Sequence, residues 1–212
     1  SQPNVTESIK ANDGTSEYTY KIGVQFHIAT EIPLGKNFTL NPEIGFLQRR
    51  FQYTNEVVFT DTTFVTTAIE TQSWLSLPLS VQYQFNKIKF KPYISAGVEV
   101  NYLIGDNLDV TRSRRGYQLI EEKTFDVKDQ RESIVLQGLV SAGMRIPLGG
   151  GYVVTEVRFA YGLTTVNNKN SAFAGASDLP FSYGYADSVF KVNSLSVTAG
   201  YVYNIFNPKK LK

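Results

Sequence analysis

The chain has 212 residues, 42% of them hydrophobic, a formal net charge of +2, no cysteine and a single histidine. Cysteine-based catalysis and His-rich metal sites are therefore excluded, and the charge gives no electrostatic drive toward nucleic acid. No stretch approaches the ~20 consecutive apolar residues of a membrane-spanning helix, and the length suits one barrel or sandwich domain.

Seven segments alternate apolar and polar residues with the period of two that is typical of β-strands. In the first segment, Ile22, Val24 and Phe26 share one face, and polar residues occupy the other. No apolar face of the seven carries a charged residue. In chain order the segments cover residues 18–28, 38–46, 75–85, 94–102, 134–146, 153–163 and 195–205.

Strand length and connection length favour a membrane barrel over a soluble one. We expect strands of roughly 12 to 16 residues, whereas soluble strands average about 5–6 and a membrane strand needs ~9–11. Short turns at 35–37, 86–89 and 149–151 alternate with long polar segments near 52–70, 104–132 and 165–190. Short turns on one rim and long loops on the other are typical of outer-membrane barrels.

Aromatic residues gather at both ends of the apolar faces, where amphipathic rings meet the two lipid interfaces. Beside the short turns lie Phe38, Tyr83, Phe85, Phe90 and Tyr203, and beside the long loops lie Tyr18, Tyr20, Phe46, Tyr102 and Tyr161. The alternative is a soluble lipocalin-like barrel or sandwich. The sequence predicts an all-β, antiparallel, up-and-down transmembrane β-barrel in the bacterial outer membrane, with periplasmic turns and extracellular loops.

The strand count is odd, although single-chain bacterial barrels have even numbers. We assign residues 1–16 to a polar loop, 17–206 to the barrel and 207–212 to a basic periplasmic tail, and expect eight strands with seven readable. Three explanations stay open: an ascending strand precedes residue 1, residues 2–10 form a poor strand, or a partner supplies the eighth. An open barrel would leave unpaired backbone groups in lipid.

Charged residues on the polar faces should lie inside the barrel. They are Lys21, Glu31, Glu43, Arg49, Lys91, Glu99, Arg145, Glu156 and Arg158. An eight-stranded barrel is only just wide enough for side chains to fill, so these charges should pair across the lumen. By height, Glu43, Glu99, Glu156 and Arg158 should meet near the middle, with Glu31, Lys91 and Arg145 nearer the short turns. A salt-bridged plug is favoured over an ion or proton path.

His27 is the only conventional general base in the chain, and it should point into the lumen. No Ser-His-Asp set can be assembled around it, so we expect a hydrogen-bonded lumen histidine and no enzyme, cofactor or metal. In the second long loop, Arg112, Arg114 and Arg115 form a basic cluster. It is either a solvated loop or a contact with lipopolysaccharide phosphates or a protein partner.

The strand sequences resemble the PorT-like outer-membrane β-barrel family of Bacteroidetes from about residue 18 to the end. The resemblance rests on short fragments in a fixed order, each weakly specific alone. They are 22–24 (IGV), 32–34 (IPL), 40–46 (LNPEIGF), 75–79 (LSLPL), 91–97 (KPYISAG), 142–148 (AGMRIPL), 156–163 (EVRFAYGL) and 200–206 (GYVYNIF). The resemblance implies an outer-membrane location, one further strand before the first, and for some members a part in type IX secretion or gliding machinery.

The expected function is a non-enzymatic structural or accessory subunit of such an outer-membrane assembly. Its expected partners are outer-membrane lipid, lipopolysaccharide and other proteins of a membrane complex. The alternative is a narrow pore or a ligand-binding barrel.

Overall fold

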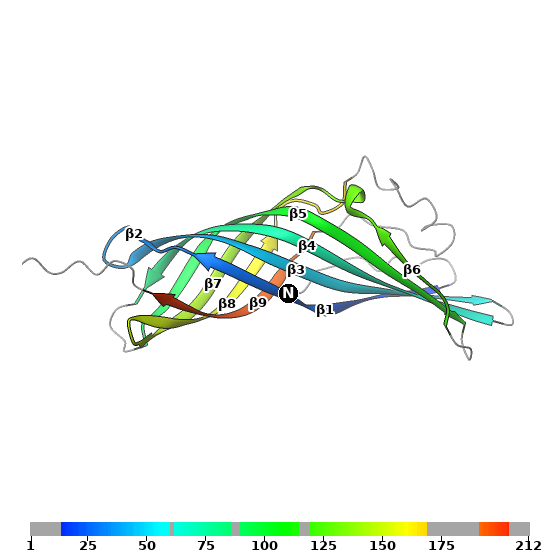
Figure 1. Ribbon diagram of the computed structural model, residues 1–212, viewed down its shortest axis with the longest axis horizontal. Helices are drawn as coiled ribbons and strands as arrows, with labels where there is room; N and C mark the ends of the chain where they lie inside the picture. The colour runs from blue at the N-terminus through cyan, green and yellow to red at the C-terminus, as the bar shows by residue number, and fades with distance from the viewer. Residues whose placement is uncertain (1–13, 60–61, 86–89, 115–118, 169–190, 204–212) are drawn as a thin grey trace, which may run out of the picture.

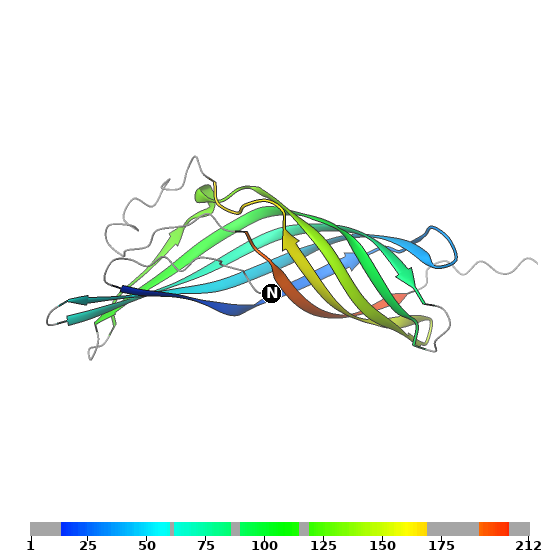
Figure 2. The same ribbon diagram turned by 180° about the vertical axis from the view of Figure 1, so that it is seen from behind.

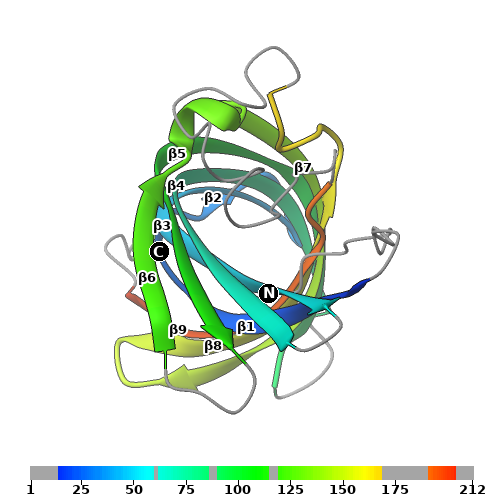
Figure 3. The same ribbon diagram turned by 90° about the vertical axis from the view of Figure 1, so that its right-hand side faces the viewer.

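The computed structural model describes residues 14–59, 62–85, 90–114, 119–168 and 191–203. They form one antiparallel sheet that curls around a lumen (Figures 1 and 3). The strands are β1 (Gly14–Ala29), β2 (Ile32–Pro33), β3 (Phe38–Phe59), β4 (Thr62–Gln84), β5 (Pro92–Arg114), β6 (Leu119–Asp126), β7 (Ile134–Leu148), β8 (Gly151–Gly162) and β9 (Ser194–Tyr203). A 3-10 turn, η1 (Lys128–Gln130), follows β6. No helix in this described part is long and apolar enough to cross a membrane.

The strand order around the sheet is β1-β3-β4-β5-β7-β8-β9, with the short β2 and β6 added to β3 and β5. All neighbours on this path pair antiparallel, so seven long strands form an up-and-down meander. β1 and β9 are its two edges, and β9 lies on the near side in Figure 2. The predicted all-β antiparallel barrel with seven readable strands is confirmed.

Large apolar side chains cover the outside of the sheet as one continuous band, which we call the apolar band. Its members on β3 to β5 are Phe38, Ile44, Phe46, Leu75, Leu77, Leu79, Val81, Ile94, Val98, Tyr102 and Ile104, all exposed. Aromatic rings close one end of the band: Tyr83 lies 5.1 Å from Phe38 and 5.0 Å from Phe85, measured between ring centroids. The side chains of Tyr18 and Tyr20, predicted for the other end, lie outside the described residues.

Tight turns join the strands at one end of the barrel, the turn end. Gly149 and Gly150 form a two-residue hairpin turn between the paired residues Leu148 and Gly151. Gly149 has a φ of 58°, a left-handed conformation that glycine adopts without steric cost. Residues 35–37 connect β2 to β3 at the same end, and the predicted turn at 86–89 lies outside the described residues.

At the opposite end, which we call the extension end, the prediction of long loops at 52–70 and 104–132 is wrong. β3, β4 and β5 are 22, 23 and 23 residues long and project well past β7, β8 and β9 (Figure 1). β1 and β6 pair with these projecting parts. The extension consists of residues 14–21, 50–59, 62–72, 105–114 and β6. Of the third predicted loop, residues 169–190 lie outside the described part.

Two β-bulges mark the level at which the extension begins. Ile22 and Gly23 of β1 together stand opposite Arg49, and Ile104 of β5 is the extra residue beside Ser73 and Trp74. A bulge bends its strand and increases the local twist. Beyond the bulges the described outward residues of β3 and β5 are polar, as with Arg50 and Gln52 on β3 and Asn107, Asp109 and Thr111 on β5. The apolar band therefore ends at the bulges.

The extension has an apolar core on its inner face. Its buried side chains form one cluster, made of Tyr53, Ala68, Leu108, Val110, Phe125 and Val127. A second cluster lies at the level of the bulges and consists of Leu47, Phe51, Trp74, Leu103, Val135, Val166 and Val192. Buried clusters of this kind make the extension a packed sheet and not a set of solvated loops.

Candidate functional site

Charged side chains bridge the lumen at four successive levels between the turn end and the extension. Nearest the turns, Arg145 Nη2 donates to Glu31 Oε1 at 2.8 Å and Nη1 donates to Gln84 Oε1 at 2.9 Å. The Tyr152 hydroxyl donates to the other oxygen of Glu31. The Arg145 guanidinium also lies 4.9 Å from the Tyr152 ring and 5.5 Å from the Tyr93 ring. Two cation–π contacts therefore add to the ion pair of Arg145 with Glu31.

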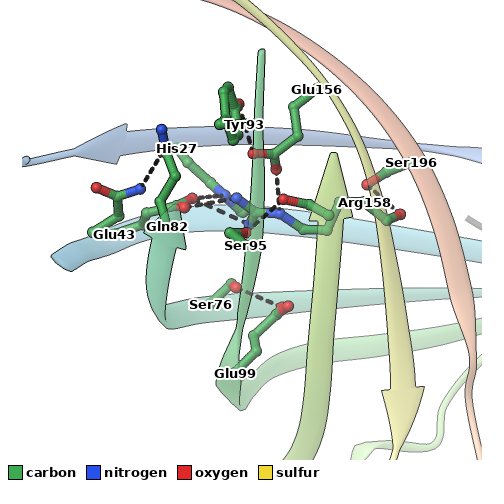
Figure 4. A network of polar contacts seen from close by, with 12 residues as sticks. His27, Glu43, Ser76, Gln82, Tyr93, Ser95, Glu99, Glu156, Arg158 and Ser196 are labelled. Atoms are coloured by element: carbon green, nitrogen blue, oxygen red, sulfur yellow. Dashed lines mark hydrogen bonds and ion pairs between the residues drawn. The ribbon is translucent and has the colours of Figure 1, made fainter. Parts of the chain in front are cut away.

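The second level is the central network of His27, Glu43, Tyr93, Glu156 and Arg158 (Figure 4). Arg158 Nη2 donates to Glu43 Oε1 at 2.6 Å, and its Nε donates to Glu156 Oε1 at 2.8 Å. His27 Nδ1 lies 3.0 Å from Glu43 Oε2, and the Tyr93 hydroxyl donates to Glu156 Oε2 at 2.8 Å. One arginine thus holds two carboxylates, and each carboxylate has a second partner on a different strand.

Two glycines make room for the rings of the central network. A Cβ on Gly45 would lie 1.9 Å from Cδ2 of His27, and one on Gly143 would lie 2.5 Å from Cζ of Tyr93. These rings therefore lie directly over the backbone of the neighbouring strand, in space that any other residue would fill.

The third level surrounds Arg49, which is 2% exposed. Its guanidinium lies 5.7 Å from the Trp74 ring and donates to Gln137, and Gln137 also accepts from Asn101 at 3.0 Å. Glu99 accepts from the Ser76 hydroxyl at 2.7 Å. Its negative charge interacts favourably with the positive charge of Arg49. The amide of Gln137 and the ring of Trp74 are thus the side-chain groups that lie against this buried cation.

The fourth level is the rim cluster of Glu70, Gln72, Asp106 and Arg131, all buried just beyond the bulges. Arg131 binds Glu70 with two donors, Nε to Oε1 at 2.9 Å and Nη2 to Oε2 at 2.7 Å, and Nε also contacts Asp106 Oδ2 at 3.1 Å. Gln72 Nε2 donates to Glu70 Oε1 at 2.6 Å. As in the central network, two carboxylates share one arginine.

The rim cluster holds one negative charge more than it can balance if both carboxylates are ionised. Asp106 Oδ1 is buried and has no hydrogen-bond partner among the described residues. Burial and then the nearby charge of Glu70 raise the pKa of Asp106 well above its ordinary range, against the opposing effect of Arg131. A proton on Asp106 therefore leaves one carboxylate for one guanidinium.

This shift makes the stability of the extension depend on pH, with a defined sign. The folded chain keeps a proton on Asp106 that the unfolded chain releases above its ordinary pKa of 3.8. The contribution of Asp106 to the free energy of unfolding is therefore largest below pH 3.8 and declines as the pH rises through the raised pKa. Asp106→Asn should remove this decline, and so make the extension more stable than the wild type at pH 8 and equally stable at pH 4.

Trp74 provides a fluorescence probe for this prediction. Trp74 is the only tryptophan, and its indole N–H donates to Gln72 at 3.3 Å, while Gln72 Nε2 lies 3.3 Å from Asp106 Oδ2. Trp74 fluorescence should titrate in the wild type and remain constant with pH in Asp106→Asn. An identical titration in both proteins would show that Asp106 is not the titrating group.

The structure buries most of the predicted lumen charges inside the barrel and leaves two exposed. Glu31 pairs with Arg145, and Glu43 and Glu156 pair with Arg158, at the heights expected. Glu99 lies one level above the central network and does not join it. Lys21 and Lys91 are exposed and not buried with the others: Lys21 lies at the β1 bulge, and Lys91 lies just before β5 near the turn end.

The predicted basic cluster lies at the far tip of the extension. Arg112 and Arg114 belong to the end of β5, and Arg115 lies outside the described residues, as do the tail at 207–212 and residues 1–13. The Arg112 guanidinium lies 4.6 Å from the Phe64 ring. β1 begins at Gly14, within the segment assigned to a loop.

Sequence reasoning missed the rim cluster and the two tyrosines of the lumen. Glu70, Asp106 and Arg131 fall in segments predicted as loops, so their faces were not assigned. The threonine-, valine- and isoleucine-rich run at 62–69 was the available signal for a strand. Tyr93 and Tyr152 each begin the inward face of a strand beside a turn.

The side chains of these levels are arranged mainly as paired charges. The described residues contain no group of three or more metal-ligating side chains. His27, the sole histidine, contacts a carboxylate through Nδ1 and not a nucleophilic hydroxyl. Ion pairs at three heights and the buried Arg49 at a fourth fill the lumen with ordered side chains, as expected for a narrow barrel.

A curled antiparallel sheet with an apolar outer band and an ion-paired lumen defines a transmembrane β-barrel. The model of the outer membrane protein beta-barrel domain family matches residues 2–168. The chain therefore belongs to this family and is located in the outer membrane. Comparisons with curated proteins and with solved structures found no match.

Proposed function

We propose that this barrel is a non-enzymatic, non-conducting structural subunit of an outer-membrane assembly, and that the extension is its docking surface outside the cell. The observation that carries the proposal is the continuation of β3, β4 and β5 beyond the apolar band as one sheet with its own core. At about 3.3 Å per residue, residues 105–114 alone project ~33 Å past the band. A barrel that served only as an anchor would not need such a projection.

The filled lumen supports a structural role over transport. Arg145, Arg158 and Arg131 each form an ion pair with a carboxylate from another part of the sheet, and each does so at a different height. Breaking such buried pairs to admit an ion or ligand would leave uncompensated charges, which is strongly unfavourable.

The proposal also includes the kind of assembly. The fragments shared with PorT-like barrels support a type IX secretion or gliding assembly, with protein partners on the polar outer face around Arg50 and Asn107. Arg112 and Arg114, at the tip of the extension, are suited to lipopolysaccharide phosphates. Lipid surrounds the apolar band.

The test is site-specific photo-crosslinking in the native outer membrane. A photo-reactive residue in place of Asn107, on the exposed face of the extension, should give a discrete adduct with another protein that mass spectrometry identifies. The matched control replaces Val157, exposed in the apolar band of β8, and should give no such adduct. Failure of every position on the outer face of the extension to crosslink to protein would refute the docking role.

Conductance decides between the structural subunit and the alternative, a narrow pore. The purified full-length protein in a planar bilayer should show no stepwise current. If the barrel is a pore, reproducible steps will appear, and Arg158→Met, which removes the central bridging cation, will change their size.

A further inference from the structure

The apolar cluster at the level of the bulges, which we call the septum, extends across the lumen. It takes residues from β3, β4, β5 and β7, from the segment that follows β8 and from the segment that precedes β9. Each of its side chains is at most 5% exposed. Beyond this level β7, β8 and β9 no longer take part, and the extension is an open sheet. The septum is therefore the last layer that the strands of the barrel enclose.

Two valines that lie outside the strands complete the septum, and hydrogen bonds fix both of them. The carbonyl oxygen of Val166 accepts from the backbone N–H of Glu132 at 2.7 Å. The carbonyl oxygen of Val192 accepts from Nε2 of Gln137 at 2.7 Å. Both donors lie on β7 or directly before it, so the chain on either side of residues 169–190 is attached to the wall of the barrel with its apolar side chains in the lumen.

The exposure of the inward side chains changes along the barrel and falls to almost zero at the septum. On β7, Ser141 is half-buried, Leu139 is 4% exposed and Val135 is 0% exposed. Along β9 and the segment before it, exposure falls from the half-buried Thr198 to 1% at Val192. The inward faces thus become accessible toward the turn end, while the septum is dry.

A positive charge, Arg49, lies within the septum. Leu47 and Phe51 flank Arg49 on the inward face of β3, and both belong to the septum. Arg49 Nε and Nη1 have no hydrogen-bond partner among the described residues. Glu99 lies on β5 four residues nearer the turn end than Leu103 of the septum, and so outside the apolar layer. A fixed cation in a dry constriction repels other cations, as arginine does in water-selective channels.

We propose that the septum is the permeability barrier of the lumen, in which the apolar side chains exclude water and Arg49 excludes cations. Polar side chains that bond to one another, as in the central network, still offer donors and acceptors to water, whereas an apolar constriction loses its water. The inference rests on the non-conducting barrel of the proposed function and assigns the barrier to one layer. Breaking an ion pair nearer the turn end leaves this barrier in place.

The test is the conductance of the full-length protein in a planar bilayer. Val166→Asn combined with Val192→Asn, the asparagine pair, places two polar groups in the septum without changing the sheet, and should raise the current at least ~10-fold above that of the wild type. Val127→Asn is the matched control, because Val127 is 0% exposed but belongs to the core of the extension. Val127→Asn and Arg158→Met should both stay at the wild-type level.

Ion selectivity tests the part of Arg49. In a potassium chloride gradient, the current through the asparagine pair should reverse on the chloride side of zero. Adding Arg49→Gln, which removes the charge and keeps a polar side chain, should shift the reversal potential toward zero. Should the asparagine pair fail to fold, Val166→Ala combined with Val192→Ala opens the layer by volume alone and carries the same expectation.

The outcomes separate the septum from the proposed function. A silent wild type with an equally silent asparagine pair would overturn the septum and leave the non-conducting barrel standing. Stepwise current in the wild type would refute the non-conducting barrel, and the septum with it. An equal rise in Val127→Asn or Arg158→Met, or a cation-selective current in the asparagine pair, would also overturn the proposal.

Discussion

Replacing Arg158 with methionine is expected to lower the free energy of unfolding by about 3–5 kcal/mol, because it leaves two buried carboxylates without their shared cation. Glu43 and Glu156 are each about one-tenth exposed and depend on Arg158 for their only ion pairs with arginine among the described residues. Methionine retains much of the volume of the arginine side chain, so the decrease in the free energy of unfolding measures the loss of charge. Urea unfolding in lipid vesicles, followed by Trp74 fluorescence, measures it.

The rescue variant separates unpaired charge from lost packing. Adding Glu43→Gln and Glu156→Gln to Arg158→Met removes both uncompensated charges and should restore most of the loss. Glutamine can keep the contacts to His27 and Tyr93. If the triple variant is as unstable as Arg158→Met alone, the effect arises from packing and the electrostatic account is wrong.

Replacing Arg131 with methionine should open the extension while the barrel stays folded. Both side-chain donors that bind Glu70 are lost, and Glu70 is 1% exposed, so we expect a local loss of about 3–5 kcal/mol. Hydrogen exchange should become faster over residues 62–72 and 105–114 and remain unchanged over β7 and β8.

Two comparisons make the Arg131 prediction specific. Lys123→Met removes a positive charge from the same extension, where the exposed ammonium lies 4.8 Å from the Phe125 ring, and should cost no more than about 1 kcal/mol. Adding Glu70→Gln to Arg131→Met should recover protection. Faster exchange throughout the barrel would contradict a local role for the rim cluster.

The alternation of apolar and polar residues was enough to predict the barrel, because lipid requires an apolar outer face on every strand. Each outward residue from Ile94 to Tyr102 is apolar, and each inward residue is polar or small, so the faces can be read directly. Heights above the turns then brought Glu31 to Arg145 and Glu43 to Arg158. These pairs depend on strand order and residue count, both of which the sequence carries.

The extension could not be read in the same way because it lies beyond lipid. Its outer face is mostly polar and its inner face mixes apolar residues with Glu70 and Asp106, so the contrast between faces is weak. The bulge at Ile104 also reverses which residues of β5 point inward: Leu103 is buried below it and Asp106 above it. A one-residue insertion of this kind leaves no mark in the periodicity before the structure is known.

The lumen pairs constrain how the barrel can assemble. Arg145 is 114 residues from Glu31 in the chain, and Arg158 is 115 residues from Glu43. Hairpins such as β3–β4 can form from neighbouring residues. Glu31 and Glu43, however, have no arginine partner until β7 and β8 have joined the sheet. Contacts this distant in sequence slow folding, because loop entropy is lost before they form. The chain is therefore expected to enter the membrane as a nearly complete sheet, since strands inserted one at a time would carry bare charges into lipid.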